Sequence, residues 1–329
     1  MARRPLTPRG SRAIRSVNTE RPTASVKRAV RRALRSEPVG EAVRAIAALR
    51  GRGLVLVYHR VTQTEPSRSE VVPVVSSTLF RRQLEALADV GDIVPLETLL
   101  RDRDRHARPR FAITFDDDYV THVADALPVL SALDARATFF LSGRVLHRLG
   151  SYWFELLERL LVERGTDAVG RLLGSPTDRI DELIAVCERD PKLHGVLADE
   201  SVDDPRHLDR SQIQTLSDAG MAIGFHTLHH EVLTRLDDEE LDAAVTVGRS
   251  ELEAVIGRPV VHFAYPHGKA DRRVADIVRN AGYDAAWTGH PRPMRRGDDR
   301  YVLGRWEPGR REVDDLLAET AIRLTRGGG

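Results

Sequence analysis

Cysteine is almost absent from this sequence. Its 329 residues include a single cysteine, Cys187, which excludes an internal disulfide framework and any zinc site built from several thiolates. A metal site in this chain would therefore have to use histidine and carboxylate ligands. Aromatic residues are also scarce, at 5%, but 41% hydrophobic and 30% charged residues are typical of a globular protein and exclude a coiled coil or a low-complexity chain.

Long hydrophobic runs are absent as well. The longest apolar run near the start, residues 54–58, is far shorter than the ~20 residues that a membrane-spanning helix needs. The arginine-rich first residues are not followed by the apolar stretch of about 7–15 residues that marks a secretory signal. We therefore expect a cytoplasmic protein, with a peripheral membrane contact as an open alternative.

A net charge of +1 conceals a strong asymmetry along the chain. Residues 1–53 contain 14 Arg and Lys against three Glu, so the remaining residues carry an excess of acidic groups. Residues 1–25 are rich in Arg, Pro, Ser and Thr and are predicted to be disordered. Residues 26–50 are compatible with a basic helix, with three interpretations: packing on the folded body, contact with an anionic membrane, or contact with nucleic acid. Because no aromatic residues interleave these charges, no specific nucleic-acid partner is expected.

Strand-like and helix-like segments alternate from residue 54 onward. Short apolar runs predict strands at residues 54–58, 111–115, 137–141, 221–225, 260–265, 285–288 and 302–305. Apolar residues at helical spacing predict helices at residues 80–87, 123–133, 211–219, 241–256 and 274–278. Pro128 is expected as a break or a first-turn residue. Such alternation is typical of a parallel sheet with helices outside it, and seven or eight strands favour a barrel.

This pattern divides the chain into three parts. Residues 1–53 form a basic N-terminal extension, residues 54–310 form the barrel, and residues 311–329 form a C-terminal helix and tail. Residues 151–210 interrupt the barrel with a leucine-rich helical pattern, which predicts a helical insertion that covers one end of the barrel. Cys187 lies in this insertion and is expected to be an inert buried thiol.

Three adjacent carboxylates follow the predicted strand 111–115. They belong to the segment TFDDDY, residues 114–119, and like charges so close together raise one another's pKa unless a cation neutralises them. Neighbouring residues at a strand end point in different directions, so one carboxylate can bind a metal ion while the next faces the substrate. An acidic turn that caps the following helix is the alternative interpretation.

A group of histidines follows the predicted strand 221–225. If residues 226–230 (HTLHH) turn helically, His226 and His230 share one face and can bind one metal ion. The spacing matches the HExxH pattern of metalloproteases but lacks its glutamate, so the general base must come from elsewhere, and Asp116 is the candidate. Surface or capping histidines without a metal are the alternative interpretation.

The third segment is FAYPHG, residues 263–268. Its proline and glycine shape a loop whose backbone N–H groups can stabilise an oxyanion, and a plain strand-to-helix turn is the alternative. All three segments lie at the carboxyl ends of predicted strands, where parallel barrels place their active sites. Two histidines and one aspartate leave a coordination position open, as in catalytic metal sites, and a further carboxylate can act as general base.

Taken in order, these segments resemble the polysaccharide deacetylase domain, also called the NodB-homology domain or carbohydrate esterase family 4. The resemblance covers residues 54–305 and rests on TFDD (114–117), ATFF (137–140), IGFHTLHH (223–230) and FAYPHG (263–268). It implies a distorted (β/α)7-type barrel, in agreement with the alternation of predicted strands and helices.

The resemblance also implies a role for each residue of the first two segments. Asp116 would be the general base that activates water. Asp117, His226 and His230 would bind one divalent metal ion, expected to be Zn²⁺, with other divalent ions as alternatives. Thr227 would orient the turn that carries the histidines.

The third segment and two tryptophans are implied at the substrate. The backbone N–H of His267 would occupy the oxyanion position, with Tyr265 and Pro266 beside it in the same loop. Trp153 and Trp306 are candidate walls against a sugar ring, with ordinary core packing as the alternative for each.

The sequence departs from the family pattern at three places. Asp118 replaces the usual glycine after the paired aspartates, which leaves the geometry of that loop open. Ala264 stands where the family has an arginine that orients the base, and Arg305 is predicted to replace it. The family's late histidine, a general acid, has no match after residue 300. The resemblance to family members with a similar early Tyr-His implies that His59 serves instead, and the first and last strands of a closed barrel are neighbours. A structural histidine near the metal is the alternative.

The expected function is therefore hydrolysis of the N-acetyl group of an amino sugar or glycan to acetate and a free amine. The expected partner is a carbohydrate or amino-sugar substrate. Two alternatives remain open: the same fold acting on a non-sugar amide or a formyl group, and a degenerate barrel that binds a glycan or a partner without catalysis.

Overall fold

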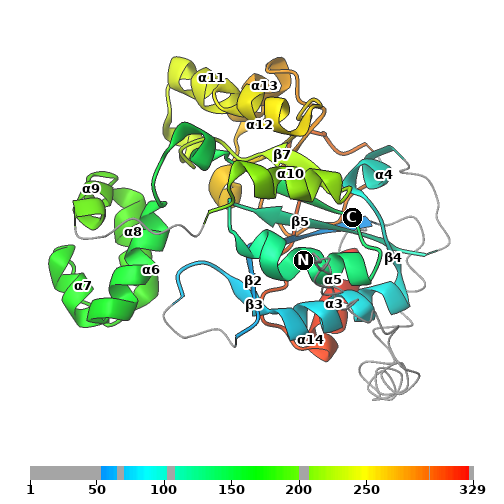
Figure 1. The fold of residues 1–329 in the computed structure, drawn as a ribbon, viewed down its shortest axis with the longest axis horizontal. Helices are drawn as coiled ribbons and strands as arrows, with labels where there is room; N and C mark the ends of the chain where they lie inside the picture. Colours follow the sequence, from blue (N-terminus) through cyan, green and yellow to red (C-terminus); the bar gives the residue numbers. More distant parts are fainter. Residues whose placement is uncertain (1–52, 65–69, 102–107, 200–206, 296, 326–329) are drawn as a thin grey trace, which may run out of the picture.

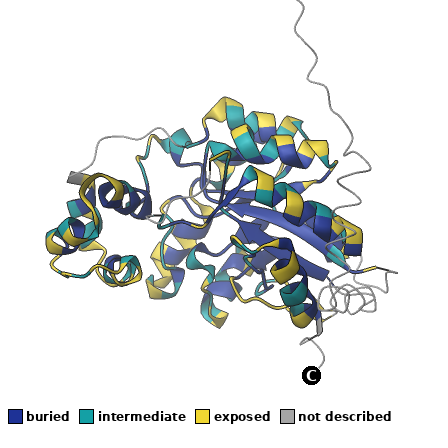
Figure 2. Ribbon diagram, turned by 90° about the horizontal axis from the view of Figure 1, so that it is seen from below, coloured by how far each residue is buried: buried dark blue, intermediate teal, exposed yellow. Residues whose placement is uncertain are grey.

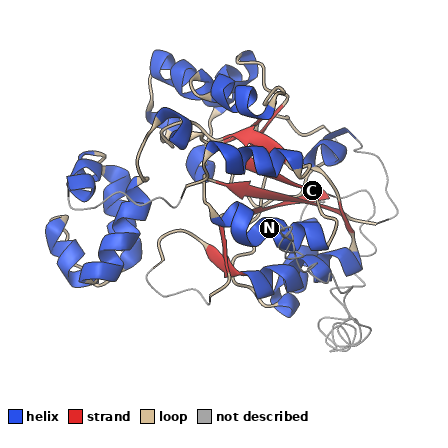
Figure 3. Ribbon diagram, viewed as in Figure 1, coloured by secondary structure: helices blue, strands red, loops and turns tan. Residues whose placement is uncertain are grey.

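A parallel sheet surrounded by helices forms the body of the molecule (Figure 1, Figure 3). The computed structural model describes residues 53–64, 70–101, 108–199, 207–295 and 297–325. Two short strands, β2 (Arg60–Thr62) and β3 (Val74–Ser76), pair with each other beside the main sheet. The α/β architecture predicted from the alternating segments is confirmed.

Seven strands make the main sheet. They are β1 (Gly53–Tyr58), β4 (Asp92–Ile93), β5 (Arg110–Asp116), β6 (Ala137–Leu141), β7 (Ala222–Phe225), β8 (His262–Ala264) and β9 (Ala285–Trp287). Their order is β1-β5-β6-β7-β8-β9, with β4 paired to the start of β5. The strands are mostly buried (Figure 2), because parallel strands covered on both faces are near-continuous apolar runs.

The segment from Leu303 to Trp306 connects the two edges of this sheet. Leu303 forms a parallel bridge to Trp287 of β9, and Trp306 forms one to Leu56 of β1. Backbone hydrogen bonds of 2.7–3.0 Å accompany both bridges. The strand predicted at residues 302–305 is therefore reduced to isolated bridges, but these bridges complete the distorted barrel that the sequence predicts.

Helices separate the strands, as the periodicity predicts. They are α3 (Ser77–Val90), α4 (Leu96–Arg101), η1 (His122–Ala126), α5 (Leu127–Ala132), α10 (Arg210–Asp218), α11 (Asp238–Thr246), α12 (Arg249–Ile256), α13 (Arg272–Asn280) and α14 (Val313–Thr325). Pro128 lies in the first turn of α5. The single helix predicted at residues 241–256 is wrong, because Val247 is extended and Gly248 has a φ of 94°, which ends α11 and starts α12 anew.

Local sequence explains where these helices begin and which face they bury. The Ser76 side chain accepts a hydrogen bond from a first-turn N–H of α3, and Asp237 does the same for α11. Phe80, Leu84 and Leu87 of α3, whose spacing predicts the helix, are all buried against the sheet in the main core. Helix ends and apolar faces in this protein thus follow ordinary capping and periodicity.

The helical insertion has an apolar core of its own. Helices α6 (Trp153–Arg164), α7 (Thr166–Leu172), α8 (Ile180–Arg189) and α9 (Lys192–Asp199) form a group at the left of the barrel in Figure 1. Their buried leucines and Cys187 form a cluster that is separate from the cores around the sheet. Burial raises the pKa of the Cys187 thiol to about 11, which keeps the thiol protonated.

Charged side chains attach the insertion to the barrel. Nη2 of Arg60, in β2, lies 2.6 Å from Oε2 of Glu158, and both side chains are largely buried. The same carboxylate oxygen accepts a hydrogen bond from the backbone N–H of Val71 at 3.0 Å. Nε2 of His207 lies 2.7 Å from Oε2 of Glu155. These paired charges fix α6 next to the carboxyl end of β1.

The structure describes little of the two ends of the chain. The basic extension predicted for residues 1–53 falls almost wholly on residues 1–52, which lie outside the described residues, so its helix and its membrane contact stay predictions. Helix α14 lies within the predicted C-terminal helix and tail, and residues 326–329 are outside the described part. Among the described residues, every helix is too short or too polar to cross a membrane.

Candidate active site

The carboxyl ends of β1, β5, β7 and β8 surround a cavity of about 310 Å³. The barrel side of its lining is polar and consists of His59, Asp116, Asp117, His226, His230, His267, Arg305 and Glu307. The opposite side is formed by residues 71–73 and by side chains of α6 and α8. The three segments singled out in the sequence therefore meet at one edge of the barrel, where such folds place their active sites.

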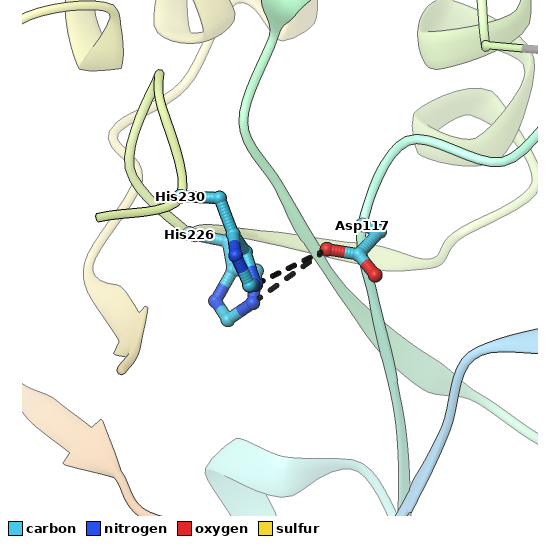
Figure 4. Close-up of side chains that lie close together, drawn as sticks. All are labelled: Asp117, His226 and His230. Atoms are coloured by element: carbon cyan, nitrogen blue, oxygen red, sulfur yellow. Dashed lines mark ion pairs between the residues drawn. The ribbon is translucent and has the colours of Figure 1, made fainter. Parts of the chain in front are cut away.

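Asp117, His226 and His230 bring three ligand atoms together (Figure 4). Oδ1 of Asp117 lies 3.8 Å from Nε2 of His226 and 3.7 Å from Nε2 of His230, and all three atoms lie within 4.8 Å of one another. Oδ1 of Asp117 is buried and has no hydrogen-bond partner among the described residues. A buried carboxylate oxygen without a donor is costly, so this donor set fits a divalent cation.

Burial disfavours the ionised form of Asp117, and a bound cation would offset this effect. Burial raises the pKa of Asp117 to about 6, although nearby His226 opposes the rise. Burial and the neighbouring histidines hold the pKa of His230 well below its ordinary value, so its imidazole keeps a free lone pair. Nδ1–H of His226 donates to the carbonyl oxygen of Ala264 at 2.8 Å, so Nε2, which faces Asp117, is the ring nitrogen available to a metal ion.

The loop that carries the two histidines is not helical. Residues 226–230 form an irregular turn in which Thr227 and His230 both have a φ of 55°. The Thr227 hydroxyl accepts a hydrogen bond from the N–H of His230 at 3.1 Å and donates to Glu231 at 2.7 Å. The helical face assumed from the spacing is therefore wrong, but the turn still brings the rings of His226 and His230 to a centroid distance of 5.0 Å.

Left-handed backbone is concentrated at this cavity. Asp117, Thr227, His230 and His267 are four of the six non-glycine residues with positive φ in the described ranges. Each such residue costs roughly 1–3 kcal/mol and persists only where its surroundings enforce it. For Asp117, part of that support is Nε2–H of His122, which donates to the Asp117 carbonyl at 3.0 Å. Nothing in the sequence pattern points to His122, because its contacts are with backbone carbonyls.

Asp116, the last residue of β5, forms a two-point ion pair with Arg305. Nη1 and Nη2 of Arg305 lie 2.6 Å and 2.7 Å from the two carboxylate oxygens. Burial opposes ionisation of Asp116, but the ion pair with Arg305 outweighs it and lowers its pKa to about 2. Arg305 comes from the segment that closes the barrel, so the structure brings it to the base candidate although Ala264 occupies the family's arginine position.

His59 directly follows β1 and is paired with Glu307, a residue that the sequence analysis missed. Nδ1 of His59 lies 3.2 Å from Oε1 of Glu307. Burial lowers the pKa of His59, but Glu307 and the two site aspartates outweigh it and raise this pKa to about 9. Glu307 follows Arg305 by two residues, so the closing segment supplies a partner to both Asp116 and His59.

Asp118, which departs from the family pattern, supports the loop after β6. Its Oδ1 accepts a hydrogen bond from the Ser142 N–H at 2.8 Å, and its Oδ2 accepts from the Ser142 hydroxyl at 2.5 Å and the Arg144 N–H at 3.0 Å. The Tyr152 hydroxyl donates to Ser142 at 2.7 Å. Because both carboxylate oxygens are satisfied, the extra charge of Asp118 stabilises this loop.

Only part of the third segment reaches the cavity. His267, in the short 3₁₀ turn η4 (Pro266–Gly268), lines the cavity, and its ring lies 4.6 Å from that of His230. Tyr265 is fully buried and its hydroxyl donates to the Tyr301 carbonyl at 2.7 Å. Pro266 is buried as well. Tyr265 and Pro266 therefore support the loop from within the core and do not line the cavity.

The two candidate tryptophans differ in position. Trp153, at the start of α6, lines the cavity. Trp306 is only 2% exposed and packs in the main core, with the Arg323 guanidinium 4.6 Å from its ring. This corrects the prediction of Trp306 as a cavity wall, because the bridge of Trp306 to β1 places it in the layer between sheet and helices. His229 is exposed and does not belong to the ligand group.

Replacing Gly268 with alanine is expected to destabilise the protein. Gly268 has a φ of 64°, and a Cβ there would lie 2.5 Å from the backbone nitrogen of Gly289, whose N–H donates to the Gly268 carbonyl. We expect about 1–2 kcal/mol from the left-handed conformation and a further ~1–3 kcal/mol from the overlap. Gly257→Ala, with φ of 68° and open space around the Cβ, is the control for denaturant unfolding. Equal losses in the two variants would contradict the close approach.

Comparison with known proteins gives one consistent result. The family model described as polysaccharide deacetylase matches residues 103–286. YxkH of Bacillus subtilis (strain 168) is 20% identical over 255 residues, which are 76% of this chain and 69% of that protein. The deacetylase PplD of Streptococcus pyogenes, solved with acetate, aligns with a TM-score of 0.58 and 17% identity over 82% of this chain and 98% of that chain. IcaB from Ammonifex degensii aligns with a TM-score of 0.53 and 20% identity over 83% and 97%.

The structure is a distorted (β/α) barrel with carboxylates and histidines gathered at its carboxyl edge. The family model covers more than half of the chain, and the protein belongs to the polysaccharide deacetylase family. Members of this family are hydrolases that cleave the amide C–N bond of N-acetyl groups, so this chain is an amide hydrolase of the glycan-deacetylating class. The resemblance stated from the sequence is confirmed.

Proposed function

We propose that this protein removes the N-acetyl group of an amino sugar with one divalent metal ion held by Asp117, His226 and His230. The observation that supports this most directly is the difference between two adjacent carboxylates. Asp117 has a buried oxygen without a hydrogen-bond donor that faces two imidazole nitrogens, whereas both oxygens of Asp116 are held by Arg305. The first arrangement suits a ligand, and the second suits a base of fixed orientation.

Nitrogen and carboxylate donors of this kind suit Zn²⁺, and other divalent ions of similar preference are alternatives. When bound, such an ion supplies a Lewis acid for the amide carbonyl and for water. Three protein ligands leave coordination positions open, which is typical of catalytic sites and not of structural ones. The zinc assignment is therefore part of the proposal.

Asp116 is the proposed general base. Its low pKa keeps it ionised throughout the neutral range, and Arg305 uses about two of the four acceptor positions of the carboxylate. The remaining positions can accept a proton from the attacking water. Oδ2 of Asp116 lies 3.9 Å from Nε2 of His226, so a water molecule beside the ligand group is also beside the base.

His59 is the proposed general acid. Hydrolysis adds water to the amide carbon and then breaks the C–N bond, and the departing amine nitrogen needs a proton. The ion pair with Glu307 keeps His59 protonated above neutral pH, so it can supply that proton. Burial lowers the pKa of His267 to about 4, so its imidazole is neutral, and its backbone N–H is proposed to donate to the oxyanion.

Acetate release tests the proposal. Metal-stripped protein and protein reloaded with Zn²⁺ are compared on a panel of N-acetylated sugars and oligosaccharides, and acetate is measured enzymatically. We expect acetate only from the reloaded protein. Absence of acetate from every panel member, with one metal ion bound per chain, would contradict N-deacetylation and favour a different acyl group or a binding function.

Replacing Glu307 with glutamine is expected to move the alkaline limb of the kcat/KM profile to lower pH. His59 must carry a proton to act as acid, so activity falls as pH rises through its pKa, and Glu307 raises that pKa. His59→Ala should lower kcat by about 10²–10⁴-fold and remove this limb. Glu312→Gln, at an exposed ion pair with Arg82, is the control and should leave the profile unchanged. An unmoved alkaline limb in Glu307→Gln would exclude the His59–Glu307 pair from the mechanism.

A degenerate barrel that only binds glycans is disfavoured by the same geometry. That alternative rested on Ala264 and on the absence of a late histidine. Arg305 pairs with Asp116 and His59 lines the cavity, which supports catalysis because neither function lacks a candidate residue.

A further inference from the structure

The helical insertion forms the wall of the cavity that faces the candidate metal ligands. Its contributions are Trp153 and Phe154 from the start of α6, and Ile184 and Glu188 from α8. Ile184 and Glu188 are one helical turn apart and therefore share a face. The chemical groups of the reaction come from the barrel, so this wall is available to select what enters.

Two aromatic neighbours hold the indole ring of Trp153 in place on this wall. Its ring stacks on that of His194 at a centroid distance of 5.1 Å and an interplanar angle of 8°, and it meets Phe154 edge-on at 5.6 Å. Trp153 itself is only partly buried. An indole fixed by two aromatic neighbours and exposed in a cavity presents apolar area at little entropic cost, which is the usual role of aromatic residues in ligand pockets.

Glu188 adds an acceptor to the same wall. Its carboxylate oxygens lie 3.6 Å from Nδ1 of His267 and 3.8 Å from Nζ of Lys269, and neither distance is a hydrogen bond. The backbone is nevertheless fixed, because the Glu188 carbonyl accepts a hydrogen bond from Arg235 at 2.6 Å. The carboxylate is thus positioned at the cavity with acceptor capacity that the described residues do not use.

The wall is also placed rigidly relative to the barrel. Glu158 of α6 pairs with Arg60 at 2.6 Å and accepts the N–H of Val71, and Glu155 pairs with His207. The insertion has its own apolar core, so these contacts position a preformed body. A preorganised surface of this kind improves binding because little has to be ordered when the ligand arrives.

We infer that Trp153 and Glu188 form a sugar subsite that determines substrate specificity. A pyranose ring has an apolar C–H face and a rim of hydroxyls, and a partly exposed indole and a carboxylate acceptor line the same cavity. The inference rests on the proposed function and adds the residues that would select its glycan: one sugar ring would lie on the insertion while an N-acetyl group lies at Asp116 and the metal ligands.

The test compares two kinds of substrate of the same active site. One is 4-nitrophenyl acetate, which has no sugar, and the others are tetramers of N-acetylglucosamine with β-1,4 or β-1,6 linkages. Trp153→Ala should lower kcat/KM for the preferred tetramer about 10-fold or more relative to its effect on the aryl acetate, mainly through KM. Trp153→Phe should restore most of the loss, and Glu188→Gln should lower the same ratio about 10-fold.

One further measurement and a matched control make the result independent of turnover and folding. In the Asp116→Asn chain, calorimetric titration with the tetramer should give a dissociation constant that rises about 10-fold when Trp153→Ala is added. Val162→Ala, at a 67% exposed residue of the same helix α6, is the matched control and should change neither ratio nor affinity.

The outcomes separate the subsite from the proposed function. Equal losses on the aryl acetate and the tetramers, or no loss on either, would overturn the subsite while leaving the deacetylase proposal intact. Failure of the unmodified chain to bind either tetramer would also overturn it. Absence of metal-dependent hydrolysis of every substrate, with tetramer binding that depends on Trp153, would overturn the proposed function and retain the subsite.

Discussion

Replacing Asp116 with asparagine is expected to lower kcat by about 10³-fold or more while the protein still binds its metal ion. General base catalysis is worth about 10²–10⁴-fold. Asparagine has nearly the same shape but cannot accept a proton from water. The ligand atoms of Asp117, His226 and His230 do not include Asp116, so metal content measured by elemental analysis should stay close to one ion per chain.

The same substitution is expected to weaken the fold. Asp116 is 4% exposed, and its removal leaves the buried guanidinium of Arg305 without its charge partner. Breaking a buried pair in this way costs about 3–5 kcal/mol. Turnover must therefore be measured at a temperature where circular dichroism shows the variant to be folded. Adding Arg305→Met should recover part of the stability and none of the turnover.

Recovery of turnover in the double variant would contradict the assignment, because it would mean that only the unpaired charge of Arg305 had harmed the enzyme. Unchanged turnover in Asp116→Asn itself would exclude Asp116 as the base. Asp117, one residue further along the chain, would then be the remaining carboxylate of the pair, and the roles of base and ligand would have to be exchanged.

Much of this arrangement is predictable from the sequence because it depends on local chain order. β5, β7 and β8 are short apolar runs, and the segments DD, HTLHH and YPHG lie at or directly after their carboxyl ends. In a parallel sheet the carboxyl ends of strands lie at one edge, so residues that follow different strands converge. That rule alone brings Asp117 to His226 and His230, although it predicts nothing about their distances.

The partners of these residues are less predictable because they come from distant parts of the chain. Arg305 and Asp116 are 189 residues apart and meet only because the closing segment lies between β9 and β1. The motif comparison suggested Arg305 because the family's arginine was missing. Glu307 lies on the same segment, but the family pattern lacks no residue that Glu307 would replace, so the comparison does not point to it.

Backbone geometry accounts for the remaining errors. Spacing of four residues suggested a helix for His226 and His230, whereas positive φ values at Thr227 and His230 form an irregular turn. Gly248 likewise divides a helix that apolar periodicity predicts as continuous. Periodicity reports which residues share a face, and it is insensitive to a single left-handed residue.

Replacing His226 with alanine is expected to remove both the metal ion and the activity. Loss of an outer-shell partner typically costs about 10–100-fold in metal affinity, and loss of a direct ligand should cost more. Alanine also removes the hydrogen bond to the Ala264 carbonyl. We expect a metal content near zero after gel filtration and kcat below the level of Asp116→Asn under the same conditions.

Thermal unfolding with and without added Zn²⁺ separates the ligand from the base. A ligand that binds only the folded chain raises its Tm, because the unfolded chain gains nothing from it. Zn²⁺ should therefore raise the Tm of the unmodified chain and of Asp116→Asn, and should leave the Tm of His226→Ala nearly unchanged.

His229→Ala is the matched control for the ligand assignment. His229 is exposed and lies in the same turn, one residue before His230, but outside the ligand group. It should behave like the unmodified chain in metal content, in Tm and in turnover. If His229→Ala instead lost the Zn²⁺-dependent rise in Tm and His226→Ala kept it, the cation would have to bind at the outer face of the turn. The unpaired Oδ1 of Asp117 would then lack the partner that its burial demands.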